Sequence, residues 1–275
     1  MPNLLSSIGI LVRLKELDLS NCGLEQIDKI TFHKLRLLKI LDMSQNYLTD
    51  LPNSLFHKSN ITKLNLSYNR YEELPYALFS RGPEVLSILN VTVEEPLWNL
   101  ETLEASQVNI TTLLPQDLEF APNLLTLRMS GSNIVEVLPG TLKNLSSLNL
   151  LDLSQNQLLE FPKERLKGLL SLKTLNLSHN ALSELDHFPP SMINLKTVDI
   201  SRNMITELKS GTFKEAKFLD NLHLEENAIS KLHSKSFAGL HKLKFLDLSY
   251  NNLEEMNPKV LLPVERRISD LKLMG

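Results

Sequence analysis

Adjacent acidic side chains occur at residues 72–73, 94–95 and 254–255, and paired carboxylates can act together as general acid and general base. That chemistry requires burial that shifts the pKa of one partner, whereas these pairs lie on polar connecting segments. We therefore expect them to be solvent-exposed charges. The seven histidines show no metal-ligand spacing, and the chain has no glycine-rich phosphate loop, H-E-x-x-H or C-x-x-C motif. The sequence thus predicts no enzymatic activity, no metal and no cofactor.

Asparagine side chains offer a different reaction, N-glycosylation, where they begin an Asn-x-Ser/Thr triplet. Six such triplets begin at Asn60, Asn65, Asn90, Asn109, Asn144 and Asn176. Those at Asn65 and Asn176 belong to a recurring leucine-asparagine-leucine-serine segment, so repetition of the segment itself creates them. Asn144, on a predicted outer loop, is the strongest candidate for a glycan.

Charge and cysteine content limit the classes of partner. The 275 residues carry a formal net charge of −3, whereas recognition of nucleic acid by charge needs a clustered basic surface. We therefore expect no nucleic-acid partner. The single cysteine, Cys22, cannot form a disulfide within the chain. No stretch approaches the roughly 18 apolar residues that a membrane-spanning helix needs, so we expect membrane contact only through segments absent from this sequence.

The dominant feature of the chain is an internal repeat. The block Leu14-Lys15-Glu16-Leu17-Asp18-Leu19-Ser20 returns nine more times at intervals of 23 or 24 residues, with one interval of 39. The ten blocks begin at Leu14, Leu38, Ile61, Leu100, Leu124, Leu148, Leu172, Leu195, Leu219 and Leu243. Apolar and polar residues alternate within each block, which predicts a short strand with one buried face.

A polar residue recurs five positions after the second leucine of most blocks. It is an asparagine in seven copies and a cysteine in the first, giving the series Cys22, Asn46, Asn69, Asn156, Asn180, Asn203, Asn227 and Asn251. The turn after each strand leaves backbone groups buried between repeats, and an amide can both donate to and accept from them. We therefore expect a structural asparagine ladder inside the stack, with Cys22 as a buried structural thiol.

The pattern L-x-x-L-x-L-x-x-N-x-L resembles that of the leucine-rich repeat family over essentially the whole chain. The resemblance implies an α/β solenoid, a horseshoe with a parallel sheet on its concave face and loops or short helical turns on its convex face. Several copies also carry an outer phenylalanine, at Phe32, Phe56, Phe79, Phe213 and Phe237. Such units are similar to the repeats of extracellular animal proteins, including Toll-like receptor ectodomains and chaoptin-like and Slit-like proteins.

Three irregularities interrupt the pattern. The interval of 39 residues contains a strand-like segment at 86–91, which we interpret as a shortened repeat near 86–99 that bends the arc locally. Val108 and Ser132 replace the ladder asparagine, with Asn109 and Asn133 displaced one position outward, which predicts a weaker ladder there. Partial repeats occupy both ends. We therefore predict one leucine-rich repeat domain over residues 1–275, with about ten regular repeats, as a fragment of a longer protein.

Residues between the strand leucines should face the inner surface, where the resemblance places partner binding. Exposed aromatic and arginine side chains are the strongest candidates, because such residues dominate interface energetics. They form an N-terminal group, Tyr47, Tyr68, Arg70 and Trp98, and a C-terminal group, His179, Arg202, His223 and Tyr250. Acidic residues outnumber basic ones on this face, which is consistent either with a solvated surface or with a basic partner.

Together these features favour a non-catalytic scaffold from the ectodomain of a cell-surface receptor or adhesion protein, binding a protein ligand or co-receptor. Homodimerisation through the arc is a further option. Two alternatives stay open at this level. One is a cytosolic leucine-rich repeat adaptor, consistent with the single cysteine, and the other is the recognition part of a receptor whose enzymatic domain lies outside this chain.

Overall fold

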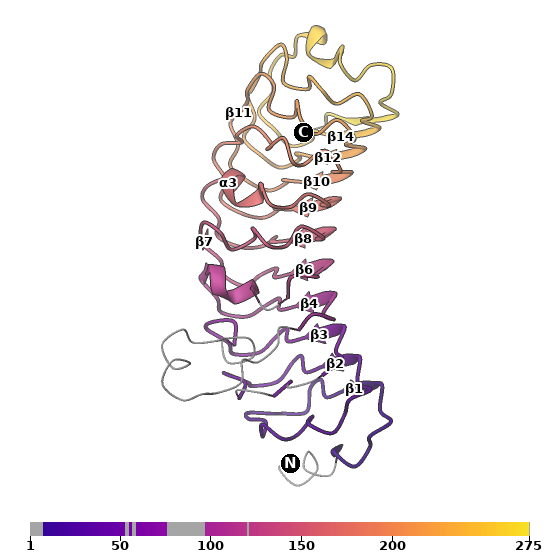
Figure 1. Cartoon of the computed structure of the whole chain (residues 1–275). Coiled ribbons are helices and arrows are strands. Elements are labelled where there is room, and N and C mark those ends of the chain that lie inside the picture. Colours follow the sequence, from indigo (N-terminus) through magenta and orange to yellow (C-terminus); the bar gives the residue numbers. More distant parts are fainter. Residues whose placement is uncertain (1–7, 53–54, 57–58, 76–96, 120, 275) are drawn as a thin grey trace.

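The computed structural model describes residues 8–52, 55–56, 59–75, 97–119 and 121–274. Short parallel strands stack one above another into a single sheet along one side of the molecule, and connecting segments return along the other side (Figure 1). The sheet has eleven strands in the order β1 (Glu16–Asp18), β2 (Ile40–Asp42), β3 (Lys63–Asn65), β4 (Thr102–Glu104), β6 (Thr126–Arg128), β8 (Leu150–Asp152), β9 (Thr174–Asn176), β10 (Thr197–Asp199), β12 (Asn221–His223), β14 (Phe245–Asp247) and β15 (Asp270–Lys272). The predicted α/β solenoid is confirmed.

The return side contains little regular structure. It has two small parallel pairs, formed by β5 (Thr112–Leu113) with β7 (Glu136–Val137) and by β11 (Glu207–Leu208) with β13 (Lys231–Leu232). Its helical turns are η2 (Pro115–Leu118), α3 (Lys163–Leu166) and η3 (Pro258–Leu261). None of the described residues forms a helix long and apolar enough to cross a membrane.

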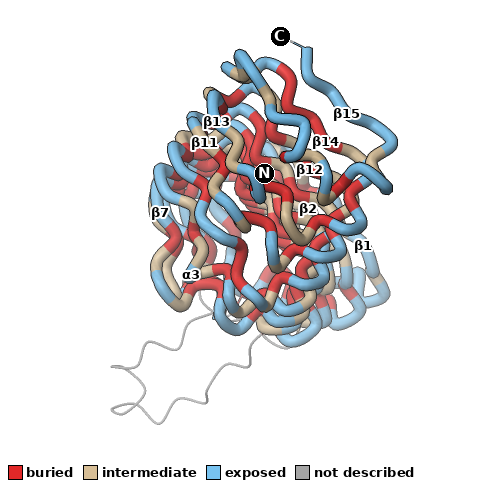
Figure 2. Tube along the Cα trace, turned by 90° about the horizontal axis from the view of Figure 1, so that it is seen from above, coloured by how far each residue is buried: buried red, intermediate tan, exposed pale blue. Residues whose placement is uncertain are grey.

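The alternation within each block determines which side of each strand is buried. The central residue of a strand points into the stack, as Leu41, Leu103 and Leu151 do with 1% or less of their surface exposed. The two flanking residues point outward. Looking down the stack, buried residues lie in the interior and exposed residues around it (Figure 2). Because no repeat can bury its leucines alone, the core is continuous from one repeat to the next.

Phenylalanines form a second line of packing on the return side. Phe32 stacks on Phe56 with ring centroids 6.0 Å apart, and Phe213 stacks on Phe237 at 6.4 Å. All four rings are buried, as their place in the repeat predicts. Phe79 lies outside the described residues.

The predicted asparagine ladder is present inside the stack. The Asn156 amide group donates to the carbonyl oxygens of Met129, Leu153 and Ser154 at 2.9–3.1 Å. Its Oδ1 accepts from the backbone N–H groups of Ser132 and Ile134 at 2.9 and 3.0 Å. One side chain therefore satisfies five buried backbone groups in two neighbouring repeats.

The same donor pattern recurs at the other ladder asparagines, Asn46, Asn69, Asn180, Asn203, Asn227 and Asn251. Cys22 occupies the first ladder position, and its Sγ–H donates to the carbonyl of Ser20 at 3.4 Å. Cys22 was predicted to be a buried structural thiol, and it is partly buried and packs against the core.

A column of left-handed residues precedes the ladder. The residue immediately before each ladder position has φ between +52° and +62°; these are Asn21, Gln45, Tyr68, Gln107, Gly131, Gln155, His179, Arg202, Glu226 and Tyr250. This conformation costs an L-residue roughly 1–2 kcal/mol. Each N–H of this column donates to a carbonyl of the next repeat, as from His179 to Ser201 at 3.0 Å, and these bonds hold the turn in place.

The interval of 39 residues separates two blocks whose strands are neighbours in the sheet. β3 pairs directly with β4, with Leu64 opposite Leu103, so no further strand stands between them in the sheet. The shortened repeat predicted near 86–99 therefore contributes no strand between β3 and β4, and the local bend of the arc stays a prediction. Alternation at 86–91 cannot distinguish a strand within the stack from one outside it. Residues 86–96 lie outside the described residues, and residues 97–99 lead into β4.

The ladder is interrupted at the two predicted positions. The N–H of Leu48 donates to Oδ1 of Asn69, the ladder asparagine of the next repeat. Tyr71 is the equivalent of Leu48 one repeat later, and Val108 stands at the ladder position that would accept from its N–H. Because valine has no amide, Tyr71 has no such side-chain acceptor. Ser132 substitutes partly, since its Oγ donates to the carbonyls of Ala105 and Ser130 at 3.2 and 3.3 Å. Val108 and Ser132 therefore make fewer ladder hydrogen bonds than an asparagine does, and the weaker ladder at these positions stays a prediction.

We expect Asn156→Ala to lower the free energy of unfolding by about 2–4 kcal/mol, because it leaves several buried backbone groups without partners. Urea unfolding of the whole chain measures the change. Asn252→Ala is the matched control, because Asn252 is exposed, follows a ladder asparagine and does not have a positive φ, and it should cost less than about 1 kcal/mol. Equal losses in the two variants would contradict the structural role of the ladder.

Candidate binding surface

The inner face consists of the outward-pointing residues of the eleven strands, together with the left-handed column at their carboxyl ends. No group of three or more histidine, cysteine, aspartate or glutamate side chains is arranged to hold a metal among the described residues. The face is therefore a row of side chains at strand spacing, about 4.8 Å from one repeat to the next.

Aspartates on this face stabilise their own turns. Asp18, Asp42, Asp152, Asp199 and Asp247 each accept a hydrogen bond at 2.8–3.0 Å from the backbone N–H two residues later. Hydrogen bonds from the Ser20 hydroxyl and N–H lower the pKa of Asp18. For Asp247, burial raises the pKa, but bonds from Ser249 and Lys272 outweigh it and the net shift is downward. The acidic character of the face is thus largely structural.

Asn65 and Asn176 stand in the same column and replace aspartate in the turn. The Oδ1 of Asn176 accepts from the N–H and hydroxyl of Ser178 at 3.0 and 2.8 Å. The Oδ1 of Asn65 accepts from the N–H of Ser67 at 3.1 Å. Turn geometry therefore accounts for both the asparagine and the serine of these two triplets.

The other predicted glycan positions differ in exposure and engagement. Asn144 is exposed on the return side, with its side chain in no hydrogen bond among the described residues. Asn60 is exposed but donates to the carbonyl of Arg36 at 2.8 Å. Asn109 is exposed and accepts from Asn133 at 3.0 Å. Asn90 lies outside the described residues.

The N-terminal aromatic group is only partly brought together. The Arg70 guanidinium lies 4.5 Å from the centroid of the Tyr47 ring, a cation–π contact between adjacent repeats. Tyr68 belongs to the left-handed column and exposes 56% of its surface. Trp98 precedes β4 by four residues and so lies on the side of the strands' amino ends. Tyr68 and Arg70 follow the carboxyl end of β3, so the structure does not place Trp98 in this group.

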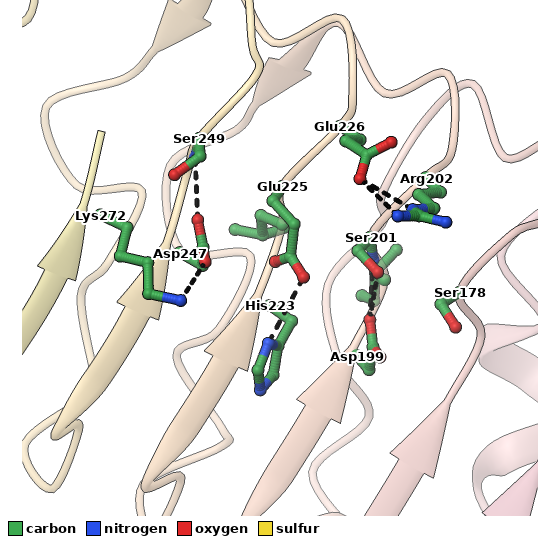
Figure 3. Close-up of polar contacts among 12 residues, drawn as sticks. Ser178, Asp199, Ser201, Arg202, His223, Glu225, Glu226, Asp247, Ser249 and Lys272 are labelled. Carbon is green, nitrogen blue, oxygen red and sulfur yellow. Dashed lines mark hydrogen bonds and ion pairs between the residues drawn. The ribbon is translucent and has the colours of Figure 1, made fainter. Parts of the chain in front are cut away.

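The C-terminal group separates into two rows, and Figure 3 shows Arg202 of the first row and His223 of the second with their partners. The first row is in the left-handed column, where His179, Arg202, Glu226 and Tyr250 follow one another in consecutive repeats. Arg202 donates through Nε and Nη2 to Glu226 Oε1 at 2.8 Å, and its Nη1 lies 3.0 Å from His179 Nε2. Since a guanidinium can only donate, this histidine nitrogen is the acceptor.

The second row is on the strands themselves. His223 stands in register between Asp199 and Asp247, and its ring packs against Phe245 with centroids 4.8 Å apart. The Glu225 carboxylate, 3.6 Å from His223 Nδ1, raises the pKa of this histidine against the opposing effect of burial. The charges of Asp199 and Asp247 add to the increase.

Sequence reasoning missed one member of this group. Lys272, on β15, lies 3.2 Å from Asp247 Oδ2 and 5.0 Å from the centroid of the Phe245 ring. It belongs to the partial last repeat, so repeat counting gave no reason to select it. The register of β14 with β15, which places Asp247 opposite Lys272, is the signal that identifies it.

A polar hollow of about 360 Å³ opens beside Arg70, at the interruption of the ladder. Its walls are Asn69, Arg70, Glu72, Gln107, Val108, Asn109, Gly131 and Asn133. Only Arg70 among them was selected from the sequence as a binding residue. The others were missed because they become neighbours only where the outward-displaced asparagines of adjacent repeats stack.

Comparison with known families gives matches along most of the chain. The family described as leucine rich repeat matches residues 12–70, 122–182 and 193–253, more than half of the sequence. A second description, leucine rich repeats in two copies, matches residues 170–211.

Two curated relatives match over shorter stretches. Tsukushi from Mus musculus is 40% identical over 67 residues, which cover 24% of this chain and 19% of the relative. Osteomodulin from Bos taurus is 31% identical over 107 residues, 39% of this chain and 22% of the relative. The matches span about a fifth of the length of these relatives.

Solved structures share the fold at low identity. In a complex of TLR13 with the single-stranded RNA ssRNA13, a chain of TM-score 0.67 and 23% identity aligns over 96% of this chain and 36% of its own length. A chain of the Drosophila Toll–Spatzle complex has a TM-score of 0.71 and 21% identity, and it aligns over 93% of this chain and 38% of its own length.

We expect Glu225→Gln to lower the pKa of His223, because the carboxylate next to the imidazole is the largest cause of its increase. A raised histidine pKa adds stability that is complete below the ordinary value of 6.5 and is lost as pH rises through the folded-state value. The variant should lose most of that pH dependence, because only the contributions of Asp199 and Asp247 are left. NMR titration of the imidazole C–H signal measures the pKa, and Glu226→Gln, which removes the partner of Arg202, is the control. An unchanged His223 pKa would contradict this assignment.

Proposed function

This chain belongs to the leucine-rich repeat family, and we propose that it is a non-catalytic scaffold that binds a protein ligand or co-receptor on its inner face. We assign it to the extracellular part of a cell-surface receptor or adhesion protein.

The observation that carries the proposal is that different residues of each repeat stabilise the fold and form the exposed inner surface. Most repeat leucines and most ladder asparagines are buried, whereas the left-handed column exposes Tyr68, His179, Arg202 and Tyr250 on a hydrogen-bonded backbone. Rigid presentation of aromatic and arginine side chains lowers the entropy cost of association. This favours binding over catalysis as the use of the face.

Charge favours a protein ligand over nucleic acid. The net charge is −3, and the inner-face arginines Arg128 and Arg202 are each paired with a glutamate at 2.8 Å. Binding to phosphates requires several free cations along one surface. The structural neighbours include both kinds of complex, Toll with Spatzle and TLR13 with RNA, and the charge of this chain supports the first kind.

An extracellular location predicts glycosylation at Asn144, because this asparagine is exposed on the return side and its amide makes no hydrogen bond among the described residues. The chain, expressed with a secretion signal in animal cells, should migrate faster on a gel after peptide-N-glycosidase treatment. Asn144→Gln should remove part of that shift, whereas Asn65→Gln should leave the Asn144 glycan in place. Full-length protein with no glycosidase-sensitive shift would favour the cytosolic adaptor instead.

Ligand binding tests the function directly. Tetramers of the chain are screened against secreted and cell-surface proteins, and captured partners are measured by surface plasmon resonance. We expect either Tyr68→Ala with Arg70→Ala, or Arg202→Ala with Tyr250→Ala, to weaken binding by at least about tenfold, as loss of a hot spot does. Lys209→Ala, on the return side, is the control. Unchanged affinity in both inner-face variants would show that the inner face is not the binding surface.

A further inference from the structure

We propose that the hollow beside Arg70 binds a carboxylate displayed by the protein ligand, as an aspartate or glutamate side chain. The inference rests on the proposed function and names the chemistry that one end of the inner face recognises. It depends on the interruption of the ladder at Val108 and Ser132.

Outward displacement of the asparagines builds a second, exposed amide chain. Gln157 Nε2 donates to Asn133 Oδ1 at 3.2 Å, and Asn133 Nδ2 donates to Asn109 Oδ1 at 3.0 Å. All bonds run in one direction, from later repeats toward the N-terminus. The chain therefore ends at Asn109 with its Nδ2 group, a pair of donors without an acceptor among the described residues.

Those donors lie on the wall of the hollow that Arg70 also lines. The guanidinium is held over the Tyr47 ring at 4.5 Å, which uses its face and leaves its N–H edges free. In the described part of the chain, no carboxylate lies within 4.0 Å of Arg70, unlike Arg128 and Arg202. A held but unpaired guanidinium beside free amide donors is the arrangement that receives a carboxylate.

Gly131 leaves room for the Gln107 side chain on the wall of the hollow. It occupies the left-handed column at φ +62°, and a Cβ there would lie 1.9 Å from Nε2 of Gln107. The Gln107 amide therefore lies over the glycine and adds another donor group to the wall. One acid, Glu72, also lines the hollow, and its charge disfavours a phosphate or sulfate dianion relative to a single carboxylate.

The test uses small probes, so its result does not depend on whether a protein partner has been found. The ¹⁵N-labelled chain, produced in bacteria, is titrated with N-acetyl-aspartate N-methylamide, its neutral asparagine counterpart, and acetate. We expect saturable shifts of the Arg70 Nε–H and Asn109 Nδ2–H₂ signals with the aspartate probe, with a dissociation constant on the order of millimolar. The asparagine probe should produce no saturable shift, and acetate should bind more weakly.

Two substitutions locate the site. Arg70→Gln and Asn109→Asp, both at exposed positions, should each weaken binding of the aspartate probe by about tenfold or more, as loss of a charge-assisted hydrogen bond does. Arg202→Gln, which removes an arginine already paired with Glu226, should leave the affinity unchanged.

Three results would overturn the proposal. If the asparagine probe gave the same response as the aspartate probe, the hollow would not recognise a carboxylate. If acetate bound with the same affinity, the carboxylate would not need to come from a side chain of the ligand. A glycan found by mass spectrometry on Asn109 of the secreted protein would occupy the same Nδ2 group and so would also exclude the site. Because these readouts need no protein partner, they fail independently of the proposed function.

Discussion

The fold depends on satisfying backbone groups that every repeat buries when its chain turns away from the sheet. A leucine core explains why repeats adhere, but leucine offers nothing to an N–H or a carbonyl inside the stack. The ladder amides supply both donors and an acceptor, so each asparagine links the turn of its own repeat to that of the preceding one. Strand register, the left-handed column and the aspartate turns all follow from that fixed position.

Much of this architecture is predictable because the constraint recurs in every copy. Alternation within the blocks predicted the ten strands, and the asparagine spacing predicted which side chains lie inside, including the gap at Val108. These predictions concern each repeat and its immediate neighbours, where chain spacing determines spatial spacing. The exposed, outward position of Asn133 follows by the same reasoning.

What could not be predicted lies between repeats or outside the period. A strand-like segment at 86–91 satisfies alternation, but only the pairing of β3 with β4 shows that it adds no strand between them. Trp98 was grouped with Tyr68 and Arg70 by sequence proximity, although it precedes its strand and they follow theirs. The Lys272–Asp247 pair and the wall of the hollow depend on which side chains become neighbours across the stack, and single-repeat patterns carry no such information.

Residues of the left-handed column can change the binding surface without changing the stability of the fold. Its backbone is fixed by hydrogen bonds that any residue but proline can make, and its positions already hold aromatic, acidic, basic and amide side chains as well as glycine. A substitution there changes the surface that a ligand meets while the core and the ladder stay intact. Divergence among related sequences should therefore accumulate in this column, one residue per repeat, as changes of partner rather than losses of fold.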